Sequence, residues 1–303
     1  MRIKKQKLAL ISTSPLMMML ALRLQEDGNE VTIFDYSKNV GGAWTWFNNK
    51  YSKRYDKIPK YTNIINPYNK REVNFTSIMN NFLKKKYKIE VKQTKKKFEI
   101  NYDYKKKYTY NFSKFFEFAS KKLKINKKFI FKIETLANNK VRLNDKIMFD
   151  KVFIPSFSGL KKIKIYNKEV FFPDTKKIIS EHLSIIAKKF KLKNFYYSQF
   201  FDNNFDRVKI EKIKKIYCLT ARLDHSIKGI KITKLKRFYL DKFVKQSDLI
   251  NLQISKFHNY YRNKNQLQKL MNIVKNSNIK YVDTTQFMCG FFALRKIFNV
   301  SKL

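Results

Sequence analysis

The sequence predicts an α/β fold with a second α+β unit, and its first 46 residues carry most of the evidence. Lys7 to Ser12 is a short apolar run with the length of a buried strand. The segment after it places apolar residues at helical spacing on one side and charged residues on the other, and Gly28 ends it. Val31 to Phe34 is a second apolar run. Strand, helix and parallel strand in this order open a doubly wound sheet.

The turn between the first strand and the helix stands where dinucleotide-binding folds carry G-x-G-x-x-G, with the helix N-terminus facing a pyrophosphate. The three glycine positions are occupied here by Ser12, Ser14 and Met17. Asp35 follows at the spacing of about 20 residues expected of a ribose-binding carboxylate. An adjacent glycine pair comes next, in a chain that holds only 6 glycines.

In this order of parts the chain resembles the FAD-dependent oxidoreductases of the amine-oxidase and UDP-galactopyranose-mutase type, with an altered glycine motif. The resemblance implies a Rossmann-like FAD/NAD(P)-binding domain, FAD as the cofactor and a separate substrate domain. The cofactor-binding residues that it implies are Ser12, Ser14, Pro15, Leu16, Asp35, Gly41, Gly42, Ala43, Trp44, Asp283 and Thr284.

The replaced glycines have steric consequences. The middle glycine normally lets the backbone approach the pyrophosphate, and the last one lets helix and strand pack closely. The hydroxyl of Ser14 can itself donate to a phosphate oxygen, and a helix N-terminus offers free N–H groups. Met17 is expected to push the helix outward. Two interpretations stay open: a flavoprotein with shifted geometry, and a non-catalytic descendant that acts as a partner or scaffold.

The same segment also fits a targeting signal, because Arg2, Lys4, Lys5 and Lys7 precede an apolar stretch. No small-x-small cleavage site follows, and the stretch from Leu8 to Leu22 is short for a bilayer span. We therefore expect a βαβ unit here and no membrane span.

A net charge of +44 favours polyanionic partners at first sight. Lysine far outnumbers arginine, however, and accompanies many Asn, Ile, Phe and Tyr residues, as AT-rich coding produces. Nucleic-acid readers favour arginine for bidentate contacts. We expect a small-molecule partner and no nucleic acid, with a basic polyanion-binding protein as the alternative. Cys218 and Cys289 lie in apolar runs, which indicates buried reduced thiols and a cytoplasmic location.

Apolar patterns further along the chain predict the remaining helices and strands. Helices are expected over 75–90, 112–124 and 178–191, and strands over 98–104, 108–112, 140–143, 145–155, 168–172, 194–200, 216–221 and from 279. The run Asp150, Lys151 and Val152 resembles the family's return to the dinucleotide domain, and Asp283 stands in its closing element. The expected domains are 1–70 with 130–160 and 275–303 for dinucleotide binding, and 71–129 with 161–274 for the substrate.

Candidate substrate-binding residues lie in the second unit. Arginine is scarce in this chain, so Arg207 and Arg222 are candidates for planar, bidentate recognition of a carboxylate or phosphate. His225 can exchange a proton near neutral pH. The plain alternatives are a salt bridge of Arg207 with Asp206 and a surface histidine. No catalytic or metal-binding constellation is recognised. The sequence thus predicts a divergent FAD-dependent oxidoreductase-like protein acting on an anionic or sugar-nucleotide substrate.

Overall fold

The computed structural model describes part of the chain, and the described part holds the helices α1, α4 and α6 and the strands of four sheets. The described residues are 5–37, 40–41, 62–65, 81–94, 107–155, 160–166, 168–171, 176–191, 196–199, 205–213, 215–223, 241, 243–261 and 264–282.

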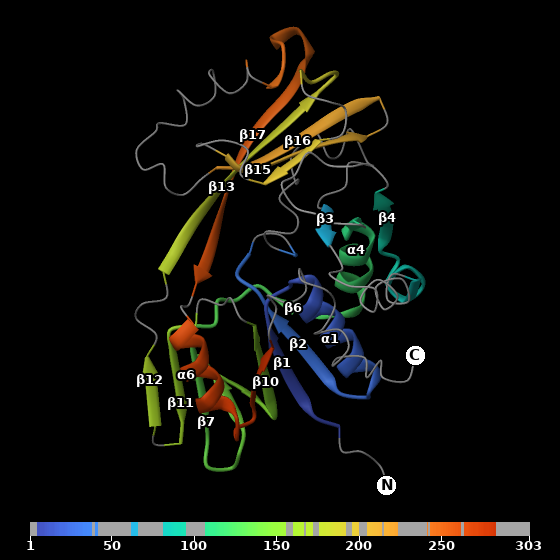
Figure 1. The fold of residues 1–303 in the computed structure, drawn as a ribbon. Helices are drawn as coiled ribbons and strands as arrows, with labels where there is room; N and C mark the ends of the chain where they lie inside the picture. The colour runs from blue at the N-terminus through green and yellow to red at the C-terminus, as the bar shows by residue number, and fades with distance from the viewer. Residues whose placement is uncertain are drawn as a thin grey trace.

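A five-stranded parallel sheet forms the base of the fold (Figure 1). Its order is β6 (Lys124–Asn126), β2 (Glu30–Phe34), β1 (Lys7–Ile11), β10 (Lys151–Pro155) and β18 (Ile279–Val282). Counted along the chain this is 3-2-1-4-5, the doubly wound order, so the predicted α/β fold class is confirmed. The order reverses between β1 and β10, and ligands of such sheets bind outside the carboxyl ends of the strands at that point.

Helix α1 (Pro15–Glu26) connects β1 to β2, as the opening pattern predicts. The helix ends where Gly28 adopts a φ of 88°, a left-handed conformation that glycine takes without strain. The N–H of Gly28 donates to the Gln25 carbonyl at 3.0 Å, which satisfies one of the last carbonyls of the helix.

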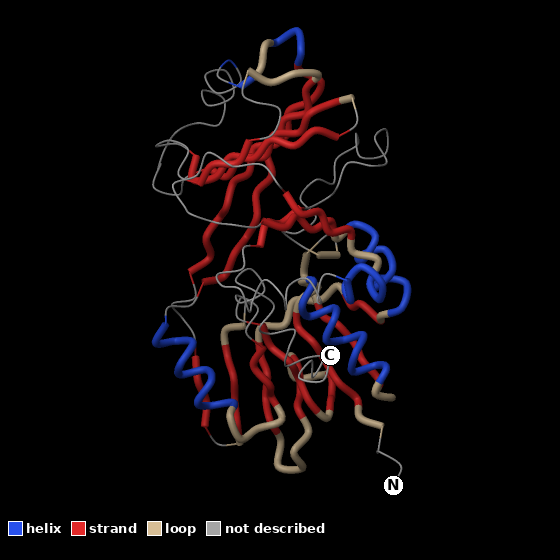
Figure 2. Tube along the Cα trace, turned by 45° about the vertical axis from the view of Figure 1, so that its right-hand side comes forward, coloured by secondary structure: helices blue, strands red, loops and turns tan. Residues whose placement is uncertain are grey.

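Two layers cover the two faces of the parallel sheet. Side chains alternate along β1, and Leu8 and Leu10 pack in one cluster with α1 and α4 (Ser113–Lys122). Ala9 and Ile11 pack in a second cluster with α6 (Lys264–Val274) and with a mixed sheet. The sheet is therefore buried on both faces, as a parallel sheet requires. Figure 2 shows the helices along this lower half of the molecule.

The mixed sheet has the order β12, β11, β7, β8 and β9, with only β11 and β7 parallel. Its strands are β12 (Lys168–Phe171), β11 (Lys162–Ile165), β7 (Lys132–Thr135), β8 (Val141–Leu143) and β9 (Ile147–Phe149). The strand predicted over 145–155 is divided at Asp150 into β9 and β10, which belong to different sheets. The Asp150 carboxylate accepts the Lys7 N–H at 2.6 Å and guides β10 beside β1, so the predicted return to the parallel sheet is confirmed.

An antiparallel sheet occupies the other end of the molecule (Figure 1). Its order is β14 (Tyr196–Gln199), β15 (Phe205–Ile213), β16 (Ile216–Leu223), β13 (Lys176–Ala187) and β17 (Leu249–Tyr261). The helix predicted over 178–191 is wrong, because residues 176–187 form β13. Its isoleucines suit a pleated surface, and pairing with β16 on one side and β17 on the other decides the conformation.

A small antiparallel sheet of β3 (Thr62–Ile65), β5 (Lys107–Asn111) and β4 (Glu90–Thr94) completes the fold, with a 3-10 turn at Gln246–Asp248. β5 and α4 match the strand and helix predicted over 108–124, and residues 81–87 are helical within the helix predicted over 75–90. The strand predicted over 98–104 lies outside the described residues. None of the helices that the structure describes is long and apolar enough to cross a membrane.

The sheet pairings bear on the predicted domain ranges. β6 lies within 71–129, the range assigned to the substrate domain, yet it pairs with β2 in the parallel sheet. β11 and β12, from 161–274, extend the mixed sheet that covers the same parallel sheet. The ranges themselves remain a prediction, and strand pairing joins these segments to the parallel sheet and to the mixed sheet that covers it.

Candidate functional site

The turn that follows β1 keeps the backbone shape of a glycine turn without the glycine. Ser12 has a φ of 102°, a conformation that non-glycine residues rarely adopt and that costs about 1–3 kcal/mol. Two hydrogen bonds hold it: the Ser12 N–H donates to the Phe34 carbonyl at 2.7 Å, and the Ser12 Oγ accepts the Ser14 N–H at 3.0 Å. The side chain that replaces glycine thus fastens the turn itself.

The N-terminus of α1 follows this turn, and no side chain among the described residues caps it. Ser14 is the N-cap residue, but its side chain bonds none of the first helical N–H groups, and Pro15 contributes no N–H. The Ser14 Oγ is buried and has no hydrogen-bond partner among the described residues. An unpaired buried hydroxyl costs about 1–3 kcal/mol, so this atom suits a ligand oxygen at the start of α1. Leu16 is 1% exposed, which leaves its side chain to the core.

Asp35, at the carboxyl end of β2, accepts hydrogen bonds from other residues of the protein. Its Oδ2 accepts the Thr13 N–H at 2.7 Å and also the Thr13 hydroxyl, and its Oδ1 accepts the Ser37 N–H at 2.6 Å. The residue is only 6% exposed. Both oxygens of the carboxylate therefore serve the turns after β1 and β2, and the role of Asp35 as a direct ribose ligand stays a prediction.

Gly41 joins the same hydrogen-bond network. Its N–H donates to the Thr13 Oγ1 at 2.7 Å, while the Thr13 hydroxyl donates a hydrogen bond to Asp35 Oδ2. Gly41 has a φ of 89°, a conformation that glycine adopts without strain. The structure thus brings the predicted residues Asp35 and Gly41 together through Thr13.

Thr13 is the residue that the sequence analysis missed. It is fully buried between the two serines that replace glycines, and it links three segments of the site. One feature of the sequence could have pointed to Thr13. It is the middle residue of Ser-Thr-Ser, from which a side chain can face the second strand. In a G-x-G pattern that position is left unspecified, so the motif did not single it out.

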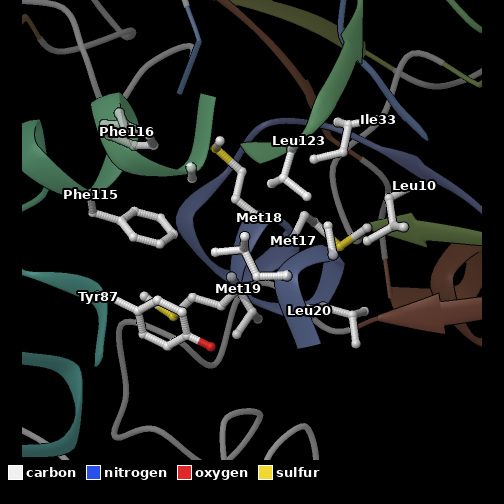
Figure 3. Packing of buried hydrophobic residues seen from close by; sticks show 14 of the residues in the cluster. Leu10, Met17, Met18, Met19, Leu20, Ile33, Tyr87, Phe115, Phe116 and Leu123 are labelled. Carbon is white, nitrogen blue, oxygen red and sulfur yellow. The ribbon is translucent and has the colours of Figure 1, made fainter. Parts of the chain in front are cut away.

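Met17, at the third glycine position, lies in the core, and the expected outward shift of the helix stays a prediction. Its side chain is fully buried and packs in the cluster of α1, α4 and the strands, rather than standing as an obstacle at the surface of the sheet (Figure 3). Met18, Met19 and Leu123 belong to the same cluster. A flexible methionine fills irregular gaps, which explains how the helix tolerates it here.

The remaining predicted residues divide into two groups. Arg207 and Arg222 occupy opposite register positions on β15 and β16, so the structure brings them together. The residues that lie outside the described part of the chain are Gly42, Ala43, Trp44, His225, Asp283 and Thr284.

The residues at the carboxyl edge of the sheet can be compared with two parts of a dinucleotide, the pyrophosphate and the ribose. The left-handed turn, the uncapped helix start and the buried Ser14 hydroxyl fit an anionic pyrophosphate. The Asp35 carboxylate already accepts three hydrogen bonds from the protein, and its contact with a ribose stays a prediction. In the described residues no group of His, Cys, Asp and Glu side chains is suited to hold a metal ion.

Comparisons with known proteins gave matches among solved structures alone. No protein-family model matches the sequence, and neither does a curated protein. The peptidyl tryptophan dihydroxylase QhpG shares 8% identity over 84% of this chain, with a TM-score of 0.42, and this chain spans 56% of its length. Tetracycline destructase Tet(51) shares 11% identity over 92% of this chain and 74% of its own, with a TM-score of 0.43. The p-nitrophenol 4-monooxygenase PnpA from Pseudomonas putida DLL-E4 shares 8% identity over 84% of this chain and 68% of its own, with a TM-score of 0.44.

Proposed function

We propose that this chain is a divergent FAD-dependent oxidoreductase-like protein whose cofactor lies at the carboxyl edge of the parallel sheet, over the start of α1. The observation that carries the proposal is the φ of 102° at Ser12. A chain that had lost the glycine motif and bound no cofactor would gain nothing from holding Ser12 at a positive φ, which is the conformation of glycine. Ser12 retains it beside an uncapped helix N-terminus, at the switch point of the 3-2-1-4-5 sheet.

The residues proposed to hold the pyrophosphate are Ser12, Ser14 and the first N–H groups of α1. FAD, when bound, supplies the redox chemistry through its isoalloxazine ring, while the protein binds and orients it. Asp35 supports this site through Thr13, since its carboxylate fixes the turn. The resemblance adds Gly42, Ala43, Trp44, Asp283 and Thr284 as further proposed cofactor contacts.

Flavin retention tests the proposal directly. The purified protein is incubated with excess FAD and desalted, and its visible absorption spectrum is recorded. Retained flavin absorbance is expected from the wild type, and a colourless wild-type protein contradicts the proposal.

A matched pair of variants tests the position of the site. Ser14→Asp and Ser14→Asn are close in size, and both residues are good helix N-caps, but only Asp adds a negative charge at the helix start. We expect the Asn variant to retain FAD and the Asp variant to lose it, because the carboxylate takes the place of the phosphate and repels it. Circular dichroism checks that both variants fold. Equal retention by the two variants places the pyrophosphate elsewhere.

The occupied Asp35 carboxylate favours a second candidate, a non-catalytic descendant of the fold that acts as a partner or scaffold. In this case the hydrogen bonds that tie Thr13 and Gly41 to Asp35 stabilise the fold and serve no ligand. A folded wild-type protein that takes up no FAD is the result expected from this candidate.

We further propose a cytoplasmic location and a small-molecule partner. Cys218 is a buried thiol, which suits a reducing compartment, and Cys289 lies outside the described residues. Partial proteolysis and mass analysis of alkylated protein test whether the two thiols are reduced, and a Cys218 to Cys289 disulfide contradicts the location.

A further inference from the structure

Two arginines and a histidine occupy one row across the antiparallel sheet. Arg222 on β16 stands opposite Arg207 on β15, and on its other side it stands opposite His182 on β13. Adjacent strands lie about 4.8 Å apart, so the three positions are direct neighbours. The row continues to Gln199 on β14 and Ser255 on β17.

This row lies on the face of the sheet opposite its apolar core. Leu183 and Ala221 are register partners, and both belong to the core cluster on one face. The neighbouring pair, His182 and Arg222, lies on the other face, because successive strand residues alternate between faces. The next pair on this second face is Ser184 with Thr220, and it is followed by the buried pair Ile186 and Cys218.

Like charges at directly opposite positions destabilise a sheet unless another charge compensates them. Among the register partners that the structure describes for this row, none is an acid. By strand alternation Glu211 shares the face, four positions from Arg207 and therefore about 13 Å along the strand. That separation exceeds the Debye length of about 8 Å at physiological salt. Asp206 stands at the register shift beside Arg207 and is the other acid to consider.

A buried hydroxyl next to the row has no hydrogen-bond partner in the part of the chain that the structure describes. Ser184 is 2% exposed, and its Oγ has no hydrogen-bond partner among the described residues. It lies two residues from His182 on the same face of β13, opposite Thr220. A buried hydroxyl of this kind costs about as much as a lost hydrogen bond, and an incoming oxygen atom would satisfy it.

We propose that Arg207, Arg222 and His182 form a site for an oxyanion, the carboxylate or phosphate group of the substrate. Arginine suits this role because its planar guanidinium binds two oxygens at once. His182 was not predicted as a candidate because its segment was predicted as a helix, and the pairing of β13 with β16 places it in the row. Anion binding stands independently of FAD, and only the description of the anion as a substrate rests on the proposed function.

The test measures the affinity of the full chain for two probes, inorganic phosphate and benzoate, by isothermal titration calorimetry at a fixed chloride concentration. We expect Arg207→Gln and Arg222→Gln each to weaken the tighter probe about tenfold or more, as loss of a hydrogen bond to a charged group does. Tighter binding of phosphate identifies a phosphorylated ligand, and tighter binding of benzoate identifies a carboxylate.

The control is Lys212→Gln, which removes one positive charge from the same strand but from the opposite face, where Lys212 pairs with Tyr217. The affinity for the probe is expected to change by no more than about twofold, since Lys212 lies five positions, about 16 Å, along the strand from Arg207 and acts only through a screened field. Equal losses in this control and in the arginine variants indicate a general cationic field and overturn the proposal. Wild-type affinity in both arginine variants overturns it as well.

Thermal unfolding without added anion separates the site from a structural ion pair. Arg222→Gln is expected to unfold at the same or a higher temperature than the wild type, because one of two opposed like charges is removed. A lower unfolding temperature in Arg207→Gln, matched by Asp206→Asn, means that an acid already holds the arginine, and this overturns the proposal. Flavin absorbance is recorded on the same samples: a colourless protein that shows the expected arginine dependence refutes the proposed function and leaves the anion site standing.

Discussion

Thr13 donates two hydrogen bonds to a single oxygen of Asp35, from its backbone N–H at 2.7 Å and from its hydroxyl. The acid that the resemblance assigns to a ribose is therefore used inside the protein. It ties the turn after β1 to the end of β2, and through the Thr13 hydroxyl it also holds the N–H of Gly41. The edge of the sheet where a cofactor is proposed is thus held in shape by a buried network.

This network predicts coupled losses of stability. Asp35→Asn and Thr13→Val each remove part of it at nearly constant volume, and each is expected to lower the free energy of unfolding by about 1–3 kcal/mol. The double variant is expected to lose less than the sum, because both changes break the same bonds. Urea unfolding measures all three. Asp27→Asn, which removes an exposed ion pair with Arg23, is the control and should stay within about 0.5 kcal/mol. Additive losses at Asp35 and Thr13 would contradict the network.

Restoring glycine at the first motif position is expected to stabilise the protein. Ser12→Gly relieves a conformation that costs about 1–3 kcal/mol and gives up one hydrogen bond, worth about 1 kcal/mol. Ser12→Ala loses the same hydrogen bond and keeps the strained φ, so it is expected to destabilise. Thermal unfolding of the pair checks the sign of each change. A stabilised Ala variant would show that the turn relaxes away from this conformation.

Restoring glycine at the third position is expected to do the opposite. The Met17 side chain fills the core beneath α1, so Met17→Ala should cost about 2–5 kcal/mol, and Met17→Gly about 1 kcal/mol more. Met271→Ala, on the exposed side of α6, is the matched control and should change the free energy of unfolding by less than about 0.5 kcal/mol. Similar effects at positions 17 and 271 would mean that Met17 is not part of the core.

The mixed sheet predicts a specific dependence of stability on pH. Arg142 donates to Glu134 Oε2 at 2.6 Å and holds the pKa of this carboxyl below its ordinary value of 4.5. A depressed folded-state pKa means that the carboxylate stabilises the fold above the unfolded-state pKa, and that this contribution is lost as the pH falls through the folded-state pKa. Glu134→Gln should therefore be less stable than the wild type at pH 7, and the difference should shrink below about pH 4.5. Urea unfolding between pH 7 and pH 3 tests this, and a constant difference would contradict it.

Local patterns in the sequence predicted the opening unit well. The apolar runs before and after α1 became β1 and β2, Gly28 ended the helix, and the return of the chain at Asp150 and Val152 placed β10 beside β1. These features depend on residues close together in the chain, whose periodicity and turn chemistry act before distant segments meet. The same reasoning failed at 178–191, where the apolar pattern suited a helix and a strand equally.

Sequence alone determined that the chain begins as a doubly wound α/β fold, with serines and a methionine at the glycine positions and an acid after the second strand. Only the tertiary structure decided what those residues do: Asp35 binds Thr13, which lies 22 residues away, and Met17 enters a core built from three distant segments. It also decided that His182, Arg222 and Arg207 share one row of a sheet. The physical reason is that strand pairing and buried hydrogen bonds join residues far apart in the chain, and their register depends on the whole sheet rather than on any local pattern.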